Sequence, residues 1–130
     1  MPALLGRQEL RSLAKARLKD SELLYQHGRY DGVFYLCGYV LELALKARIC
    51  RTLRWKQYQT GSEYQSFKTH SLETLLALSG VEHKVRPQHL ADWSVEASWN
   101  PECRYRPVGS ATAADAKEML EAARRLLRVL

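Results

Sequence analysis

Apolar residues recur at helical spacing over two long stretches in the first part of the chain, which predicts two helices. The first covers residues 8–26, and His27–Gly28 ends it in the manner of a glycine cap. The second runs to about Leu53, and we expect Asp31 to cap its start. Because the connection is short, the two helices should form an antiparallel hairpin.

The second predicted helix is apolar nearly all round, apart from one acid–base pair, Glu42 and Lys46. A helix without a polar face must be enclosed by other helices, so this segment sets the architecture. The two charges lie four residues apart and share one face. Charges on such a helix are costly unless they are paired or face a cleft. We therefore expect either a structural ion pair or a position in a cleft or dimer seam.

Shorter elements follow. Over residues 54–69 the aromatic side chains show no regular period, which indicates a loop or a short irregular helix whose rings fold back on the bundle. Ser71 should cap a short helix over residues 72–78, and another helix is expected over residues 87–97 with Pro87 in its first turn.

The last predicted helix begins at Thr112, with Asp115 in the capping-box position. Its apolar stripe comprises Ala116, Met119, Leu120, Ala123, Leu127 and Leu130. No segment has the alternation of a strand. The pattern as a whole predicts an all-α fold, an up-and-down bundle of four to five helices, and residues 1–130 have the length of a single domain.

Charge and composition refine this picture only slightly. The net charge of +6 favours an acidic partner, of which nucleic acid is the commonest, although solvated arginines explain it equally well. The longest uncharged run, residues 32–41, is about half the length of a membrane span. The first residues lack a signal-peptide core. We therefore expect a cytoplasmic protein without a membrane partner.

Cysteine and histidine residues indicate neither a metal site nor a cofactor. Cys37, Cys50 and Cys103 lack Cys-x-x-Cys spacing, and the four histidines are scattered. We expect small thiols in a reducing compartment, no bound metal and no cofactor.

One dense cluster, residues 99–107, carries candidate chemistry. In it, Arg104 and Arg106 flank Tyr105 in a proline-braced loop that leads into the last helix. Guanidinium groups bind phosphate through paired hydrogen bonds, aromatic rings such as Tyr105 and Trp99 stack on bases, and a helix N-terminus favours an anion. The alternative is that the aromatic rings plug the end of the bundle while the arginines pair with acids such as Glu42 or Glu102.

Several segments together resemble the HEPN superfamily (higher eukaryotes and prokaryotes nucleotide-binding domains). They are Gly-Arg-Tyr-Asp at residues 28–31, Tyr-Leu-Cys-Gly-Tyr-Val-Leu-Glu-Leu-Ala-Leu-Lys-Ala at 35–47, Lys-Thr-His-Ser-Leu-Glu-Thr-Leu at 68–75, and the cluster at 99–107. The likeness covers residues 13–130, and its most specific part is the segment 38–46 that contains Glu42 and Lys46.

The resemblance implies a helical bundle that forms a homodimer and is often partnered with a minimal nucleotidyltransferase. Many members are metal-independent ribonucleases that act as toxins or in antiviral defence, while others bind nucleotides or partner proteins without catalysis. The ribonucleases use an arginine, a polar residue, and a histidine about four to six residues further on. The arginine stabilises the developing charge on phosphate and the histidine transfers protons.

This chain departs from the ribonuclease pattern. Arg104 and Arg106 stand in the expected place, but no histidine follows His89. We therefore expect a protein that binds a nucleotide or RNA phosphate without catalysis, as one half of a toxin–antitoxin or nucleotidyltransferase-linked pair. Arg104, Arg106, Tyr105 and Trp99 would form the site. The alternatives are a metal-independent RNA endonuclease toxin that borrows a distant histidine and a protein-interaction module without a ligand.

The position of the loop formed by residues 98–111 decides which histidine is near. If residues 71–97 form one broken helix, this loop shares an end of the bundle with His27 and Arg29. If they form two separate legs, the loop lies near His70. The sequence leaves both arrangements open.

Overall fold

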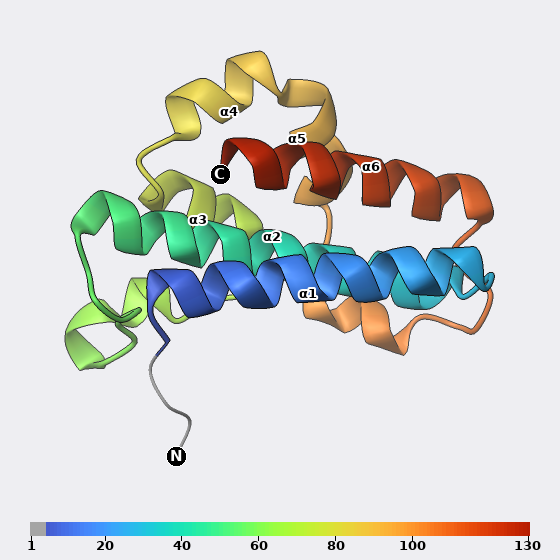
Figure 1. Ribbon diagram of the computed structural model, residues 1–130, viewed down its shortest axis with the longest axis horizontal. Coiled ribbons are helices and arrows are strands. Elements are labelled where there is room, and N and C mark those ends of the chain that lie inside the picture. Colours follow the sequence, from blue (N-terminus) through green and yellow to red (C-terminus); the bar gives the residue numbers. More distant parts are fainter. Residues whose placement is uncertain (1–4) are drawn as a thin grey trace.

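The structure, a computed structural model, describes residues 5–130 and contains six α-helices and two short 3-10 helices (Figure 1). Within those residues there is no strand, and the predicted all-α bundle is confirmed. In chain order the elements are α1 (Arg7–Gln26), α2 (Tyr30–Leu53), η1 (Ser62–Phe67), α3 (Leu72–Leu78), α4 (Glu82–Gln88), α5 (Leu90–Ala97), η2 (Pro101–Tyr105) and α6 (Ala113–Val129).

The central helix is α2, as its composition predicts. It forms an antiparallel hairpin with α1, and α6 packs against both, running alongside α1 in the opposite direction (Figure 1). The helices α3 and η2 cover other faces of α2. Because α2 is enclosed in this way, its apolar side chains are buried all round the helix, including Val33, Val40, Leu41, Ala44, Leu45 and Ile49.

Local signals set the helix ends. Gly28 has a φ of +71° just after α1, a conformation that favours glycine. At the start of α6, the Thr112 hydroxyl accepts from the Asp115 N–H at 3.1 Å, and the Asp115 carboxylate accepts from the Thr112 N–H at 3.2 Å. The Ser71 hydroxyl accepts from the Thr74 N–H at 3.3 Å and caps α3. The predicted glycine stop, capping box and serine cap are all confirmed.

The structure corrects the prediction for Asp31. The residue at the N-cap position of α2 is Arg29, whose side chain makes no capping hydrogen bond. Asp31 lies in the first turn, and its carboxylate accepts hydrogen bonds from Gly109 and Ala111 instead. The helix therefore begins without a side-chain cap, because the Asp31 carboxylate accepts hydrogen bonds from a loop far along the chain instead.

The prediction for Pro87 is also wrong. Pro87 lies near the end of α4, and the next helix, α5, begins only at Leu90. Within such a short helix, a proline near the C-terminus costs one backbone hydrogen bond, whose acceptor would be the carbonyl of the exposed residue His83. Water can satisfy that carbonyl, so the helix tolerates the proline. The division of residues 82–97 into two helices brings the α-helices to six, above the predicted four to five.

The aromatic residues of the segment 54–69 fold back on the bundle, as predicted. The ring of Trp55 lies 5.1 Å from that of Tyr64 and 4.9 Å from that of Phe67, measured between centroids. The Tyr58 hydroxyl donates to the Phe67 carbonyl oxygen at 2.6 Å. This cluster packs the 3-10 helix η1 on Trp55, which follows the end of α2.

Over residues 5–130, no helix is both long and apolar enough to traverse a bilayer. In the same part of the chain, no three His, Cys, Asp or Glu side chains gather closely enough to hold a metal ion.

Candidate anion-binding site

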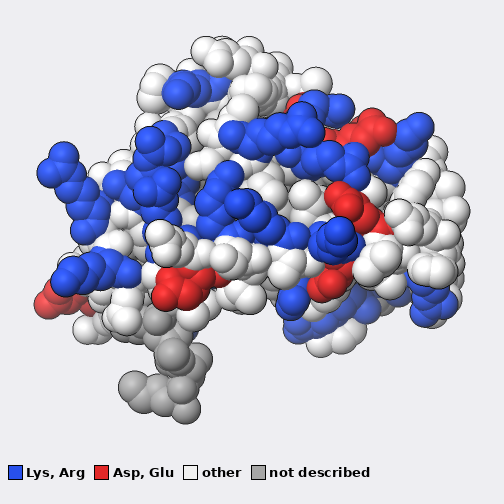
Figure 2. Space-filling model, in the orientation of Figure 1, with Lys and Arg blue, Asp and Glu red and all other residues white. Residues whose placement is uncertain are grey.

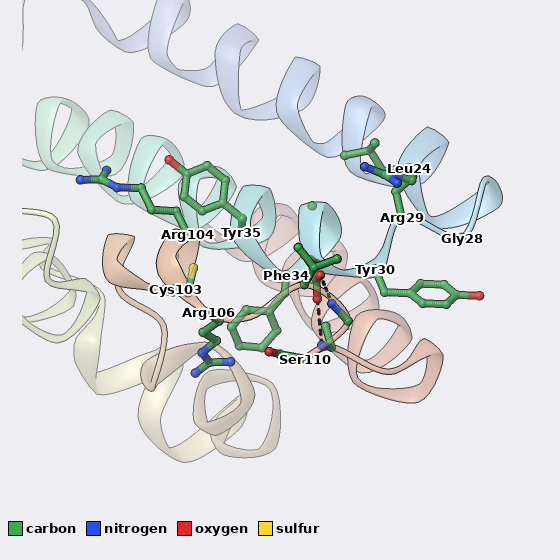
Figure 3. A pocket seen from close by; sticks show the side chains of 15 residues that line it. Leu24, Gly28, Arg29, Tyr30, Phe34, Tyr35, Cys103, Arg104, Arg106 and Ser110 are labelled. Carbon is green, nitrogen blue, oxygen red and sulfur yellow. Dashed lines mark hydrogen bonds between the residues drawn. The ribbon is translucent and has the colours of Figure 1, made fainter.

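The loop formed by residues 98–111 folds over the first half of α2 and borders a pocket of about 510 Å³ (Figure 3). Its walls come from Gly28 and Arg29 in the turn between α1 and α2, from the first residues of α2, including Phe34 and Tyr35, and from the loop itself. The loop therefore shares an end of the bundle with Arg29. Its Trp99 also packs on Tyr39, whose ring centroid lies 6.4 Å from that of His70, so the two arrangements that the sequence leaves open do not exclude each other.

Two loop arginines border this pocket, and each lies on an aromatic ring. The Arg104 guanidinium carbon is 4.8 Å from the centroid of the Tyr105 ring, and that of Arg106 is 4.8 Å from the Phe34 ring. Figure 3 shows Arg104 beside Tyr35 at one rim and Arg106 beside Phe34. Stacking of this kind orients a guanidinium while its N–H donors stay available to an anion.

Neither arginine pairs with an acidic side chain in the part of the chain that the structure describes. In particular, Glu42 pairs elsewhere, so the proposed pairing of these arginines with acids is not what the structure shows. The neighbouring Tyr105, and then Tyr35, raise the pKa of Arg104 above its ordinary value. Arg104 is therefore a permanent cation at the pocket rim.

Asp31 fastens the loop to α2. Its Oδ2 accepts from the Gly109 N–H at 2.7 Å and its Oδ1 accepts from the Ala111 N–H at 2.9 Å (Figure 3). These two backbone hydrogen bonds, the Gly109 bond first, lower the pKa of Asp31, because they favour the charged form. Asp31 thus shapes the pocket wall, and both of its oxygens are occupied by the protein.

Trp99 and Tyr105 have different environments. Trp99 is only 3% exposed, and its Nε1 donates to the Tyr35 carbonyl oxygen at 3.1 Å. Its ring packs edge-on against Tyr39 at 4.9 Å, so it belongs to the core and cannot stack on a ligand without leaving it. Tyr105 is 71% exposed beside Arg104 and remains available for stacking.

Glu42 and Lys46 form an ion pair on α2 and are not among the residues that line this pocket. Glu42 is 4% exposed, and its Oε2 lies 3.1 Å from the Lys46 Nζ. Its other oxygen, Oε1, lies 2.8 Å from Nδ1 of His70, a contact that no sequence pattern indicates. The His70 side chain is 61% exposed. A buried carboxylate therefore orients an imidazole whose remaining surface faces solvent, an arrangement that suits proton transfer.

Arg29, Phe34 and Tyr35 are pocket residues that the sequence does not single out as a site. Arg29 and Tyr35 belong to the segments that carry the family resemblance, which is the one signal that points to them. Phe34 reads in the sequence as an ordinary core residue of an apolar helix, and nothing predicts that Arg106 would lie on it.

The fold and the pocket define an all-helical domain whose loop before the last helix presents arginines over the central helix. The family model for the HEPN domain matches residues 8–130, nearly the whole chain. The chain therefore belongs to the HEPN family, whose members are nucleotide- and RNA-related helical domains, and the resemblance seen in the sequence is confirmed. No curated protein and no solved structure gives a significant match to the chain.

Proposed function

We propose that this HEPN domain binds a nucleotide or an RNA phosphate at the pocket between α2 and residues 98–111, without cleaving it. The observation that carries the proposal is a pair of rim arginines, Arg104 and Arg106, that no acidic side chain within residues 5–130 neutralises. Both are held on aromatic rings, so their donors are oriented before a ligand arrives. Tyr105 supplies the exposed ring for base stacking.

The pocket walls support binding over catalysis. No histidine is among the residues that line it, and its one carboxylate, Asp31, is occupied by backbone donors. Burial raises the pKa of the Cys103 thiol, so this group stays protonated at neutral pH. The described walls therefore offer strong phosphate ligands but no imidazole to transfer protons.

The test uses ligands that carry few phosphates, namely nucleoside monophosphates and short RNA oligomers with a 5′-hydroxyl end. Binding should stabilise the protein by about 2.7 kcal/mol when the ligand is at a hundredfold excess over Kd. The Arg104→Gln/Arg106→Gln variant should lose this stabilisation. The matched control is Lys19→Gln/Lys117→Gln, which removes the same charge from exposed residues of α1 and α6. If no nucleotide or RNA oligomer stabilises the protein, the domain is an interaction module instead.

The family resemblance also bears on how the domain assembles. We infer a cytoplasmic homodimer that serves as one half of a toxin–antitoxin or nucleotidyltransferase-linked pair, as the family resemblance implies. Light scattering should then give twice the 15.0 kDa mass of the chain. A 15.0 kDa particle at high concentration contradicts the dimer. Co-purification with the product of a neighbouring nucleotidyltransferase gene would identify the pair.

A second candidate function, metal-independent RNA cleavage, is favoured by the contact between Glu42 and His70. On α2, Tyr35 and Tyr39 lie four residues apart on one face, with Arg104 beside the first ring and His70 beside the second. A cleaving enzyme should degrade RNA in EDTA and lose that activity in His70→Gln. Intact RNA at micromolar protein would remove this candidate.

A further inference from the structure

Five arginines surround a second pocket at the opposite end of the bundle. There α1 begins while α2 and α6 end (Figure 1). This pocket, of about 240 Å³, is lined by the arginines of a group that we call the arginine cluster: Arg7, Arg11, Arg48, Arg51 and Arg128. Figure 2 shows Lys and Arg side chains spread across the face that α1 and α6 present.

Within residues 5–130, no Asp or Glu side chain forms an ion pair with any member of the arginine cluster. Elsewhere on the surface the protein does pair its arginines: Arg86 contacts two glutamates, Arg124 contacts Glu22, and Arg125 contacts Asp92. The cluster thus gathers five guanidinium groups around one pocket without an acidic side-chain partner, in contrast to Arg86, Arg124 and Arg125.

The chain itself uses few of the donors in the cluster. Arg11 donates from Nη2 to the Leu127 carbonyl oxygen at 3.1 Å, and Arg48 donates from Nη1 to that of Leu130 at 3.4 Å. The Nε of Arg48 is buried and has no acceptor. The side chains of Arg7 and Arg51 make no hydrogen bond to any described residue. Most guanidinium donors of the cluster are therefore available to a ligand.

The positive charges within the cluster repel one another. Partial burial lowers the pKa of Arg48, and the nearby charges of Arg51, Arg7 and Arg11 lower it further. Cations at the C-terminal ends of α2 and α6 gain from the helix dipoles, but Arg7 and Arg11 stand at the N-terminal end of α1, where the dipole opposes them. An anion between the three helices would relieve this repulsion.

The remaining walls indicate which anion fits. They consist of Ala47, Val129 and Leu130, so no aromatic ring is present to stack on a base. Five guanidinium groups match an anion with several charges, and their paired N–H donors suit phosphate oxygens. We infer that the arginine cluster binds a compact oligophosphate, either free tripolyphosphate or the triphosphate group of a nucleotide or an RNA 5′ end. This site would recognise the phosphate groups and not the base, and it is separate from the pocket of Arg104 and Arg106.

Calorimetric titration with sodium tripolyphosphate, which has no base, tests this inference. The Arg7→Gln/Arg51→Gln variant is suited to the test because both side chains are exposed and the fold does not use their donors. Each lost charge–phosphate contact should weaken binding about tenfold. The Lys19→Gln/Lys117→Gln control should bind tripolyphosphate as the parent does. The Arg104→Gln/Arg106→Gln variant should keep the tripolyphosphate site that Arg7→Gln/Arg51→Gln weakens, whatever phosphate binding is lost at its own pocket. Binding should also weaken as salt is raised.

Competition identifies the source of the phosphate. ATP, GTP and CTP should displace tripolyphosphate equally well, and adenosine should not displace it. RNA with a 5′-triphosphate should compete, while the same RNA with a 5′-hydroxyl should not. Competition by both RNAs, which would indicate a backbone-binding track, overturns the inference. Absence of tripolyphosphate binding, or an equal loss in the Lys19/Lys117 control, overturns it as well.

Discussion

The indole ring of Trp99 lies directly on Gly38 of α2. A Cβ atom at position 38 would come within 1.9 Å of two ring carbons, closer than any real contact. The absence of a side chain at Gly38 therefore makes room for the ring, and the Trp99 Nε1 donates to the carbonyl of Tyr35 one turn away. This contact fixes the start of the 98–111 loop against the central helix, so the core and the candidate site are coupled.

Substitution of Gly38 by alanine should displace Trp99. Although alanine favours a helix more than glycine does, the clash with a rigid ring outweighs that gain, and we expect a loss of about 1–3 kcal/mol in unfolding free energy. Urea denaturation followed by tryptophan fluorescence measures it. Gly32→Ala is the matched control in the same helix, because its new Cβ meets only the end of a flexible leucine, Leu24, at 3.1 Å. An unchanged Gly38→Ala midpoint would show that the ring moves without cost.

Removal of the Asp31 carboxylate should release the loop at its other end. In Asp31→Ala the amides of Gly109 and Ala111 lose their acceptors, so their hydrogen exchange should accelerate. Because the released loop carries Arg104 and Arg106, the affinity of this variant for a ligand of their pocket should also fall. Exchange of the capped Asp115 amide is the internal control, because its acceptor is Thr112.

The same contact sets a pH dependence. Because the folded pKa of Asp31 is lowered, its contribution to stability is complete above the ordinary value of 3.8 and is lost as pH falls through the lowered value. Protection of the Gly109 and Ala111 amides in the parent protein should therefore decline only in acid below about pH 4. Protection that declines nearer neutral pH would contradict this assignment.

Features that depend on neighbours in sequence could be predicted, and features that depend on distant contacts could not. The capping box at Thr112 follows from a residue three positions away, and the enclosed α2 follows from its lack of a polar face. Asp31, in contrast, looks like a helix cap, and only the fold brings Gly109 to it across 78 residues. Likewise, the arginine cluster collects residues from three helices, from Arg7 to Arg128, so no local motif predicts it.

For the candidate site, the sequence predicts the arginines but not their surroundings. Arg104 and Arg106 do border a pocket, yet the stacking partner of Arg106 is Phe34, which lies 72 positions earlier. Trp99 has an aromatic ring that could stack on a ligand, and it lies beside the two arginines in the sequence. It is buried instead, because Gly38 leaves room for its ring against α2. Whether an aromatic ring serves the core or a ligand is decided by packing, which residue types alone do not encode.

Replacement of one partner of the ion pair between Glu42 and Lys46 should lower the unfolding free energy more than replacement of both partners. In Lys46→Met the carboxylate of Glu42 stays buried with only His70 as a partner, and we expect a loss of about 3–5 kcal/mol. In Glu42→Met/Lys46→Met no buried charge remains, so stability should return close to that of the parent. Urea denaturation of the parent, single and double variants checks this order. A double variant as unstable as the single one would show that the pair itself holds the fold.

Glu96 of α5 should weaken the fold at neutral pH. Its side chain is fully buried, and neither carboxylate oxygen has a hydrogen-bond partner among the described residues. Burial, and then the charge of Asp92, raises the pKa of Glu96 well above its ordinary value of 4.5. The folded protein therefore holds a proton that the unfolded chain releases above that pH.

The sign of the resulting pH dependence follows from this proton. The stability associated with Glu96 is complete below the ordinary pKa and is lost as pH rises toward the raised value. Glu96→Met removes both the unpartnered oxygens and the proton, so it should raise the unfolding free energy at neutral pH by about 1–3 kcal/mol and flatten its decline above about pH 4.5. Urea titrations across this range measure both effects, with the exposed substitution Glu118→Gln as the control. A Glu96→Met variant that is less stable than the parent, with the decline unchanged, would show that the core uses this carboxyl group.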